Sequence, residues 1–200
     1  KERGTPVVLV VTGGAAIAFP EDIADAILHV WYPGEEGGNA VANVIFGKVN
    51  PNGHLPETFP RATSDLPDFA DYNMKGRTYR YMEKEPLFPF GFGLSYTSFE
   101  FSDAAVTGDT GALAGGSAIK VSAKVKNTGN LEGKDAVQLY VRKVNRTEDD
   151  PFFTLRNFAK VNIAAGETKE VSFNLTAADF ETVDAEGERV LVPGEYEIII

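Results

Sequence analysis

The sequence predicts an α/β unit, part of a sheet with flanking helices, followed by an all-β sandwich. Residues 6–60 alternate short apolar runs with helical patterns, whereas the residues after about Phe99 alternate apolar and polar positions with period two. The stretch between them is dense in proline, glycine and aromatic residues. We therefore expect two domains, with residues 1–98 forming the first and residues 99–200 the second.

Two strands and a short helical stretch are predicted at the start of the first domain. Val7–Val11 is a continuous valine and leucine run, which is typical of a parallel strand buried on both faces. Thr12-Gly-Gly14 ends it, and Pro20 then opens a short helical stretch. Ala26–Trp31 is predicted to be a second buried strand, which Pro33-Gly34 ends. This order predicts part of a parallel sheet with helices on its faces.

A second helix is predicted from about Glu36 to Phe46. Its apolar residues form one stripe at helical spacing, made of Ala40, Val41, Val44 and Ile45. Gly47 supplies the C-terminal stop. The helix starts beside two adjacent carboxylates, Glu35 and Glu36. Carboxylates are favoured there, because they interact with the positive end of the helix dipole and accept hydrogen bonds from its free N–H groups.

The alternative is that Glu35 and Glu36 form a catalytic acid/base pair. Hydrolysis of a glycoside needs two carboxyl groups roughly 5–9.5 Å apart across the scissile bond, normally from separate elements. Two neighbours in the sequence do not meet this requirement, so the helix-start interpretation is favoured. The two glutamates still follow the carboxyl end of a predicted parallel strand, where open α/β sheets bind ligands. A supporting role, behind the residues that touch a ligand, stays open for both.

Residues 48–98 are predicted to form a long ordered loop held in place by its aromatic rings, because φ-fixing prolines and φ-permissive glycines recur throughout. Within it, Asp71–Tyr81 interleaves cations with aromatic residues. Tyrosine rings can stack on sugar faces, and arginine can bond to hydroxyl groups. This makes Tyr72, Arg77 and Tyr79 candidate substrate-binding residues.

A purely structural role for this loop is the competing interpretation. In that case Arg77 and Arg80 would pair with local acids such as Asp71 or Glu83. The two interpretations are balanced for the loop as a whole, and the structural one is favoured for Arg80.

The second domain is predicted from short strands separated by turn signals. The alternating apolar residues are Val121, Ala123 and Val125; Val137, Leu139 and Val141; Phe158, Val161 and Ile163; Val171, Phe173 and Leu175; and Tyr196 and Ile198. Several short strands at this spacing are typical of a small β-sandwich. The small-residue tract Gly108–Gly116 is expected to be a loop inside this domain.

Composition excludes several classes of function. The formal net charge of −10 argues against nucleic acid, whose phosphates require a basic surface. No apolar stretch approaches the ~20 residues of a membrane helix. The absence of cysteine excludes disulfides and thiolate metal sites.

Neither a metal nor a cofactor is expected. The two histidines lack metal-binding spacing; His29 lies in a predicted strand and is expected to be packed, and His54 lies in a turn. The segment Val7–Ala18 places Gly-Gly after a strand but lacks a complete phosphate-binding motif, so a plain turn is favoured.

Three pairs of motifs carry a resemblance to a known family. They are YPGEEGGN at 32–39 with IFGKVNPNGHLPETFP at 45–60, GRTYRY at 76–81 with PLFPFGFGLSYT at 86–97, and VKNTG at 125–129 with GKDAVQLYV at 133–141. They resemble the α/β-sandwich domain of family 3 glycoside hydrolases, its passage into the C-terminal domain, and that fibronectin type III-like domain itself. The resemblance covers nearly all 200 residues.

The resemblance implies a C-terminal segment of a retaining, exo-acting β-glycosidase that hydrolyses β-glucosides or β-xylosides. In this family the nucleophile is an Asp of an N-terminal barrel, and the acid/base is typically a Glu upstream of the segment that resembles Val7–Pro60. Neither can be assigned to a residue here, so no catalytic residue is expected in this segment. Glu35 and Glu36 correspond to the helix-start motif, and the form GRTYRY resembles the β-xylosidases more.

The implied partners are a β-linked oligosaccharide or glycoside and the N-terminal barrel domain of the same protein. A homodimer is a further hypothesis. The alternative function is a non-catalytic carbohydrate-binding or adhesion module that uses the loop 71–81.

Overall fold

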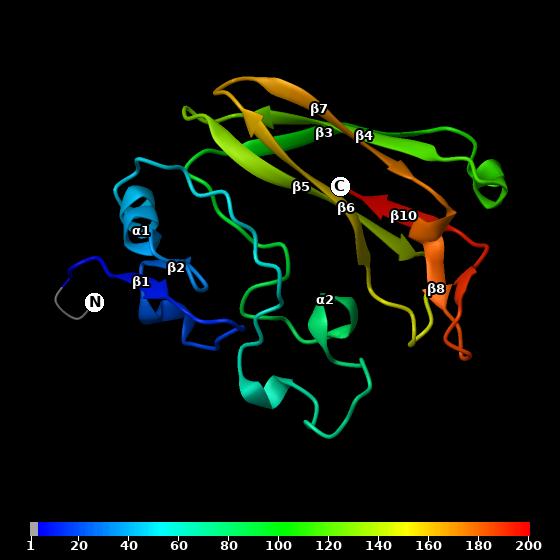
Figure 1. Ribbon diagram of the computed structural model, residues 1–200, viewed down its shortest axis with the longest axis horizontal. Helices are drawn as coiled ribbons and strands as arrows, with labels where there is room; N and C mark the ends of the chain where they lie inside the picture. The colour runs from blue at the N-terminus through cyan, green and yellow to red at the C-terminus, as the bar shows by residue number, and fades with distance from the viewer. Residues whose placement is uncertain (1–3) are drawn as a thin grey trace. The chain divides into compact units, whose positions relative to one another are not determined.

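The computed structural model describes residues 4–200, apart from the side chain of Glu21. The chain divides into two compact units, with the border between Leu94 and Ser95. Figure 1 shows the elements of both units.

The first unit contains a small parallel sheet. Strand β1, Val8–Val11, pairs with β2, Ala26–His29, in a register that runs from Val8 opposite Ala26 to Val11 opposite His29. A short 3-10 helix, Glu21–Ile23, connects the strands, and helix α1, Gly37–Ile45, follows β2. The predicted α/β order is therefore confirmed.

The prediction that both strands are buried on both faces is wrong. In β1 exposed and half-buried residues alternate, and the outward pair Val8 and Val10 is 47% and 37% exposed. The predicted helical stripe is also only half covered, because Ala40 and Ile45 are exposed. The physical reason is that a sheet of two strands with one three-turn helix has too few elements to cover both faces.

The rest of the first unit is an ordered loop, as predicted. It includes a 3-10 turn, Thr63–Asp65, and the one-turn helix α2, Thr78–Tyr81. Its centre is Phe59, which is buried and forms an isolated antiparallel bridge with Phe88. Further along, the Leu55 N–H donates to the Phe92 carbonyl at 2.8 Å. Two segments far apart in the loop therefore run side by side and hold each other.

The second unit is a β-sandwich built from two three-stranded antiparallel sheets (Figure 1). One sheet has the order β3-β4-β7, with strands Phe99–Thr107, Ile119–Asn127 and Thr168–Leu175. The other has the order β10-β5-β6, with strands Tyr196–Ile199, Gly133–Lys143 and Thr154–Ile163. A small hairpin pairs β8, Glu181–Val183, with β9, Arg189–Leu191. Short 3-10 helices lie at Thr110–Gly115 and Ala177–Phe180.

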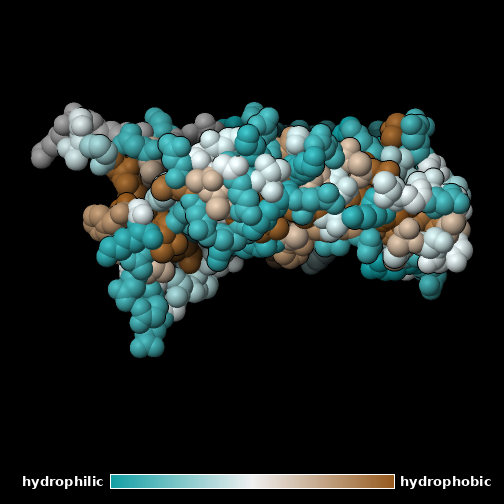
Figure 2. Space-filling model, turned by 90° about the horizontal axis from the view of Figure 1, so that it is seen from above, coloured by the Kyte–Doolittle hydropathy of each residue, from teal (hydrophilic) through white to brown (hydrophobic). Residues whose placement is uncertain are grey.

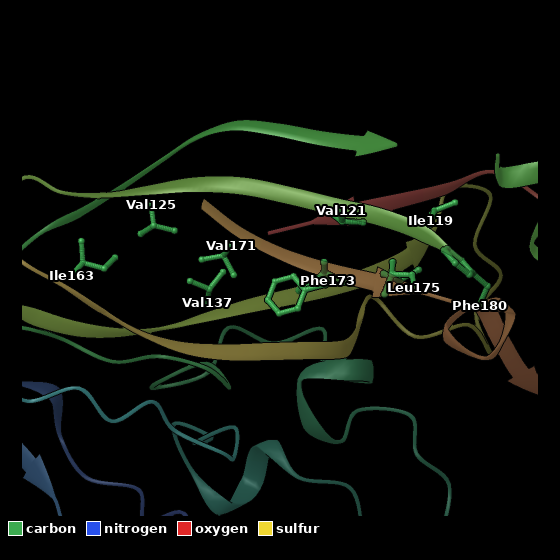
Figure 3. Packing of buried hydrophobic residues seen from close by; sticks show 11 residues of the cluster. Ile119, Val121, Val125, Val137, Ile163, Val171, Phe173, Leu175 and Phe180 are labelled. Atoms are coloured by element: carbon green, nitrogen blue, oxygen red, sulfur yellow. The ribbon is translucent and has the colours of Figure 1, made fainter. Parts of the chain in front are cut away.

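One continuous core lies between the two sheets (Figure 3). Its members are Ile119, Val121, Val125, Val137, Leu139, Val141, Ile163, Val171, Phe173, Leu175 and Phe180. All but Phe180 come from the two sheets, where the period-two pattern of the sequence places them on the inner faces, and Phe180 comes from the 3-10 helix Ala177–Phe180. The predicted sandwich is therefore confirmed.

One predicted inward residue points outward. Phe158 is 63% exposed and lies opposite Gln138, whereas its neighbour Ala159 lies opposite the buried Val137 and packs against the core. A register shift between Leu139 and Tyr140 marks an irregularity in this strand pair. Because successive side chains alternate between faces, the inward set of β6 is Ala159, Val161 and Ile163 rather than the set that begins at Phe158.

A fully buried asparagine closes one end of the sandwich. The Asn127 amide Nδ2 donates to the carbonyls of Leu131 and Ile163, at 2.7 and 2.9 Å. Its Oδ1 accepts from the Thr97 hydroxyl at 2.6 Å and from the Gly129 N–H at 3.0 Å. A Cβ at Gly129 would lie 2.2 Å from the Thr97 hydroxyl oxygen, so only glycine fits this turn.

Hydrophobic side chains of the first unit reach the surface as brown areas at the left of Figure 2. None of the described helices combines the length and the apolar character needed to cross a bilayer.

Candidate functional site

Glu35 and Glu36 lie in the turn between β2 and α1. Gly34 has a φ of 71°, and Glu36 directly precedes the first residue of the helix, Gly37. Both glutamates are exposed, and the Glu36 carboxylate accepts from the Asn39 side chain at 2.5 Å. The predicted helix start is therefore present, although neither carboxylate caps a backbone N–H of the helix.

The carboxyl ends of β1 and β2 meet two loops. The Val30 N–H donates to the Val11 carbonyl at 2.9 Å, and the Gly13 N–H donates to the Trp31 carbonyl at 3.2 Å. The Glu57 carboxylate joins them by accepting from the Ala16 N–H at 3.0 Å. Trp31 has a φ of 52°, a left-handed conformation that is strained for a bulky aromatic residue. This edge is where an open α/β sheet positions ligands.

His29 is packed at this edge, as predicted. Its ring lies 4.3 Å from the Trp31 ring and 5.3 Å from the Phe59 ring, measured between centroids. Both ring nitrogens are buried, and neither has a hydrogen-bond partner among the described residues. Burial lowers the pKa of His29, and the nearby Glu57 carboxylate partly opposes this. Burial among aromatic rings therefore favours the neutral imidazole over the charged form.

Arg77 fixes the loop that precedes α2. Its Nη2 donates to the carbonyls of Asp68 and Asp71, at 3.0 and 2.6 Å, and its Nε donates to the Asn73 carbonyl at 3.2 Å. The expected pairing of Arg77 with a local acid is thus replaced by bonds to backbone carbonyls, although its charge still lowers the pKa of Asp71, after the hydrogen bonds from Asn73. Three of the five guanidinium N–H donors are thus used within the loop, and two are left for a sugar hydroxyl.

The other two candidate residues differ in accessibility. The Tyr79 ring stacks on the Phe90 ring, with centroids 4.2 Å apart and planes 17° apart, so it joins α2 to the following segment. Tyr72 is 88% exposed. The structure thus brings Arg77 and Tyr79 into the base of the loop and leaves Tyr72 on its surface.

Sequence reasoning missed the exposure of Phe69 and expected Arg80 to pair with Asp71 or Glu83. Phe69, three residues before Tyr72, is the most exposed large hydrophobic residue among those described. Arg80 lies over the Tyr81 ring, 5.4 Å from its centroid, and its buried Nε has no partner among residues 4–200. The signal for Phe69 was the repeated Asp-aromatic pair of Asp68-Phe69 and Asp71-Tyr72, where each Asp side chain accepts from the N–H two residues ahead.

No group of three or more acidic or histidine side chains within the described part of the chain could hold a metal ion. The geometry provides two accessible features: the carboxyl edge of the sheet and the exposed rings of the Arg77-bound loop.

Comparison with known proteins gives two family matches. Residues 1–96 match the glycosyl hydrolase family 3 C-terminal domain, and residues 135–200 match the fibronectin type III-like domain. The first match covers the unit with the parallel sheet, and the second covers most of the sandwich.

Similar proteins are glycosidases that are much longer. A xylan 1,4-beta-xylosidase of Xylanibacter ruminicola is 45% identical over 202 residues, which cover 100% of this chain and 23% of the relative. A periplasmic beta-glucosidase of Salmonella typhimurium is 36% identical over 214 residues, 100% of this chain and 28% of the relative. The solved beta-glucosidase 3B from Thermotoga neapolitana in complex with glucose is 35% identical, with a TM-score of 0.87 over 98% of this chain and 29% of that one. The chain thus spans about a quarter of the length of these proteins.

Proposed function

Because the chain belongs to glycosyl hydrolase family 3, we propose that it is the C-terminal part of a retaining, exo-acting β-glycosidase that hydrolyses β-xylosides or β-glucosides. The observation that carries this proposal is the match of the entire chain to about a quarter of a xylosidase and a glucosidase. β-Xylosides are the favoured substrates, since the xylosidase is the more similar of the two.

The catalytic carboxylates are assigned to the upstream part of the protein. Retention requires a nucleophile that attacks the anomeric carbon and an acid/base that first protonates the leaving oxygen and later activates water. Glu35 and Glu36 are neighbours in one exposed turn, so they do not face each other across a bond. Their proposed role is to support the turn at the carboxyl edge of the sheet.

The Arg77-bound loop is the proposed contribution of this segment to the substrate cleft. Tyr72 is the residue proposed to touch a sugar, because its ring is free to stack. Arg77 and Tyr79 are proposed to position it, through the three carbonyls and through Phe90. The proposed partners are therefore the glycoside and the upstream barrel domain, and a homodimer is a separate proposal that light scattering of the full-length protein would test.

The test compares the full-length protein with residues 1–200 alone. We expect the full-length protein to release p-nitrophenol from aryl β-xylosides or β-glucosides, and the 200-residue chain, shown by circular dichroism to be folded, to release none. Turnover by the isolated chain would mean that the catalytic carboxylates lie within it, and inactivity of the full-length protein on both substrates would contradict the glycosidase assignment.

A carbohydrate-binding module without catalysis is the second candidate, and the exposure of Tyr72 favours it. Titration of the folded 200-residue chain with xylo- and cello-oligosaccharides distinguishes the two. Saturable binding that is lost in Tyr72→Ala would support the module, whereas no binding to the isolated chain would remove it.

A further inference from the structure

Residues 66–77 form a segment, here named the arm, that is bonded mainly to itself. Arg77 donates to three carbonyls within it, at Asp68, Asp71 and Asn73. The Asp68 carboxylate accepts from the Ala70 N–H at 2.8 Å, and the Asp71 carboxylate accepts from both nitrogens of Asn73. Since a mobile loop would not keep so many mutual bonds, the arm has a defined shape.

The base of the arm is fixed as well. Gly76, with a φ of 75°, donates its N–H to the Tyr81 carbonyl at 3.0 Å, and a Cβ there would approach the Pro67 ring to 3.3 Å. Beyond it, the Tyr79 ring stacks on Phe90. The arm is therefore a preformed projection with a pinned base.

This projection carries its apolar side chains on the outside. The exposed large hydrophobic residues are Leu66 at 40%, Phe69 at 94%, Tyr72 at 88% and Met74 at 46%. Because covering a large apolar side chain is favourable, an ordered loop that keeps several such groups in water is typical of a surface that a partner covers.

The covering partner is identified by chemistry and by chain length. Leu66, Phe69 and Met74 offer no hydrogen bond to a sugar hydroxyl, so a protein surface suits them better than a carbohydrate. The relatives that match the whole of this chain are about four times longer, and the proposed function places the catalytic portion upstream of these residues. That upstream portion is the nearest source of an apolar surface.

We propose that the arm docks onto the upstream, catalytic portion of the same protein, with Phe69 as the anchor and Arg77 as the positioning residue that preforms it. The proposal rests on the proposed function in one respect, which is that a catalytic portion precedes these residues in the full-length protein. Phe69 docks, and Tyr72 is thereby held beside the cleft. The arm is thus an internal interface that sets the position of a cleft wall.

The test measures burial of position 69 in the full-length protein. Phe69→Cys is treated with a maleimide under native conditions, and labelling is followed by mass spectrometry of the peptide, with and without xylobiose. The matched control is Phe158→Cys, which replaces another exposed phenylalanine, on β6. Under native conditions we expect the thiol at position 69 to react at least tenfold more slowly than the thiol at position 158. In urea, where the protein is unfolded, we expect the two thiols to react at the same rate.

Equal reactivity at the two positions would overturn docking. Protection at position 69 that appears only with xylobiose would also overturn it, in favour of a sugar site on the arm. Hydroxyl-radical labelling of the wild-type full-length protein gives the same answer without a variant: docking predicts weak oxidation of Phe69 and Met74 relative to Phe158, and strong oxidation contradicts it.

The outcome is separable from that of the proposed function. Protection of position 69 in a protein that hydrolyses neither substrate would keep the interface and remove the activity. Hydrolysis by a protein in which position 69 is freely labelled would keep the proposed activity and remove the proposed interface.

Discussion

The two units differ in how much of their own hydrophobic surface they cover. Three buried hydrophobic residues, Ala24, Phe59 and Leu87, lie in the first unit of the described chain, whereas the remaining twelve lie in the sandwich. Both units contain apolar strands of similar composition. The difference teaches that the sandwich covers its apolar residues with its own two sheets, while the first unit leaves more of its apolar surface exposed. We propose that elements of the rest of the protein cover this surface.

Loss of a core side chain in the sandwich is expected to have the largest effect on stability. Leu139 is fully buried between the sheets, so Leu139→Ala leaves a cavity. We expect the free energy of unfolding to fall by about 2–5 kcal/mol, measured by urea denaturation of residues 95–200. A loss below about 1 kcal/mol, in the range of surface substitutions, would show that this core is loosely packed.

The buried asparagine is expected to have the next largest effect. Asn127→Ala removes four hydrogen bonds and leaves the buried Ile163 carbonyl and the part-buried Leu131 carbonyl without this partner. A loss of about 1–3 kcal/mol is expected in the same denaturation experiment. Asn174→Ala, an exposed position on β7, is the control and should change little. Similar losses in both variants would contradict the structural role of Asn127.

A change on the open face of β1 should matter only when the upstream portion is present. Val8→Ala is expected to cost less than about 0.5 kcal/mol in the 200-residue chain, as other exposed positions do. In the full-length protein, where the face is covered, the loss should be about 1 kcal/mol or more, from two fewer buried methyl groups. Thermal unfolding of both proteins checks this, and equal effects in the two would mean that the face stays in water.

The smallest expected effect is a pH dependence confined to the first unit. His29 has a pKa below its ordinary value because of burial, so the unfolded chain binds its proton more readily. The stability that neutral His29 provides is complete above its unfolded pKa and is lost as the pH falls through that value toward the folded pKa. Tryptophan fluorescence of Trp31, the one tryptophan of the chain, should therefore report easier urea unfolding at pH 5.5 than at pH 7.5. His29→Phe should remove the difference, and an unchanged difference in that variant would assign it to other groups.

The sequence predicted the sandwich more completely than the first unit, for a physical reason. In β4, β5 and β7 the alternation of apolar residues reflects a core that the chain itself supplies, so Val125, Leu139 and Phe173 are inward as expected. In β1 the continuous valine run is typical of a strand with two covered faces, but Val8 is exposed because the two-stranded sheet and the helix that follows it do not cover this face. Phe158 was misplaced because it is three residues before Val161, so strict alternation puts the two side chains on opposite faces and Ala159 takes the inward position.

The sequence identified the kinds of residue at the candidate site, but not what each side chain contacts. The pattern of Asp71–Tyr81 identified an aromatic and cationic loop, and Tyr72 is exposed there. The sequence could not show that Arg77 donates to three backbone carbonyls, or that the Tyr79 ring stacks on the Phe90 ring. Both contacts depend on how the chain folds back on itself. The same holds for the ring cluster around His29, which joins a strand to the distant Phe59.

The stability of the first unit is expected to depend on the upstream portion, whereas that of the sandwich is not. The most direct test is amide hydrogen exchange, measured on the 200-residue chain and on the full-length protein. We expect the amides of β1 and β2 to exchange rapidly in the short chain and slowly in the full-length protein, while those of β4 and β5 exchange slowly in both. Strong protection of β1 and β2 in the 200-residue chain, equal to that in the full-length protein, would contradict the dependence of the first unit on the upstream portion.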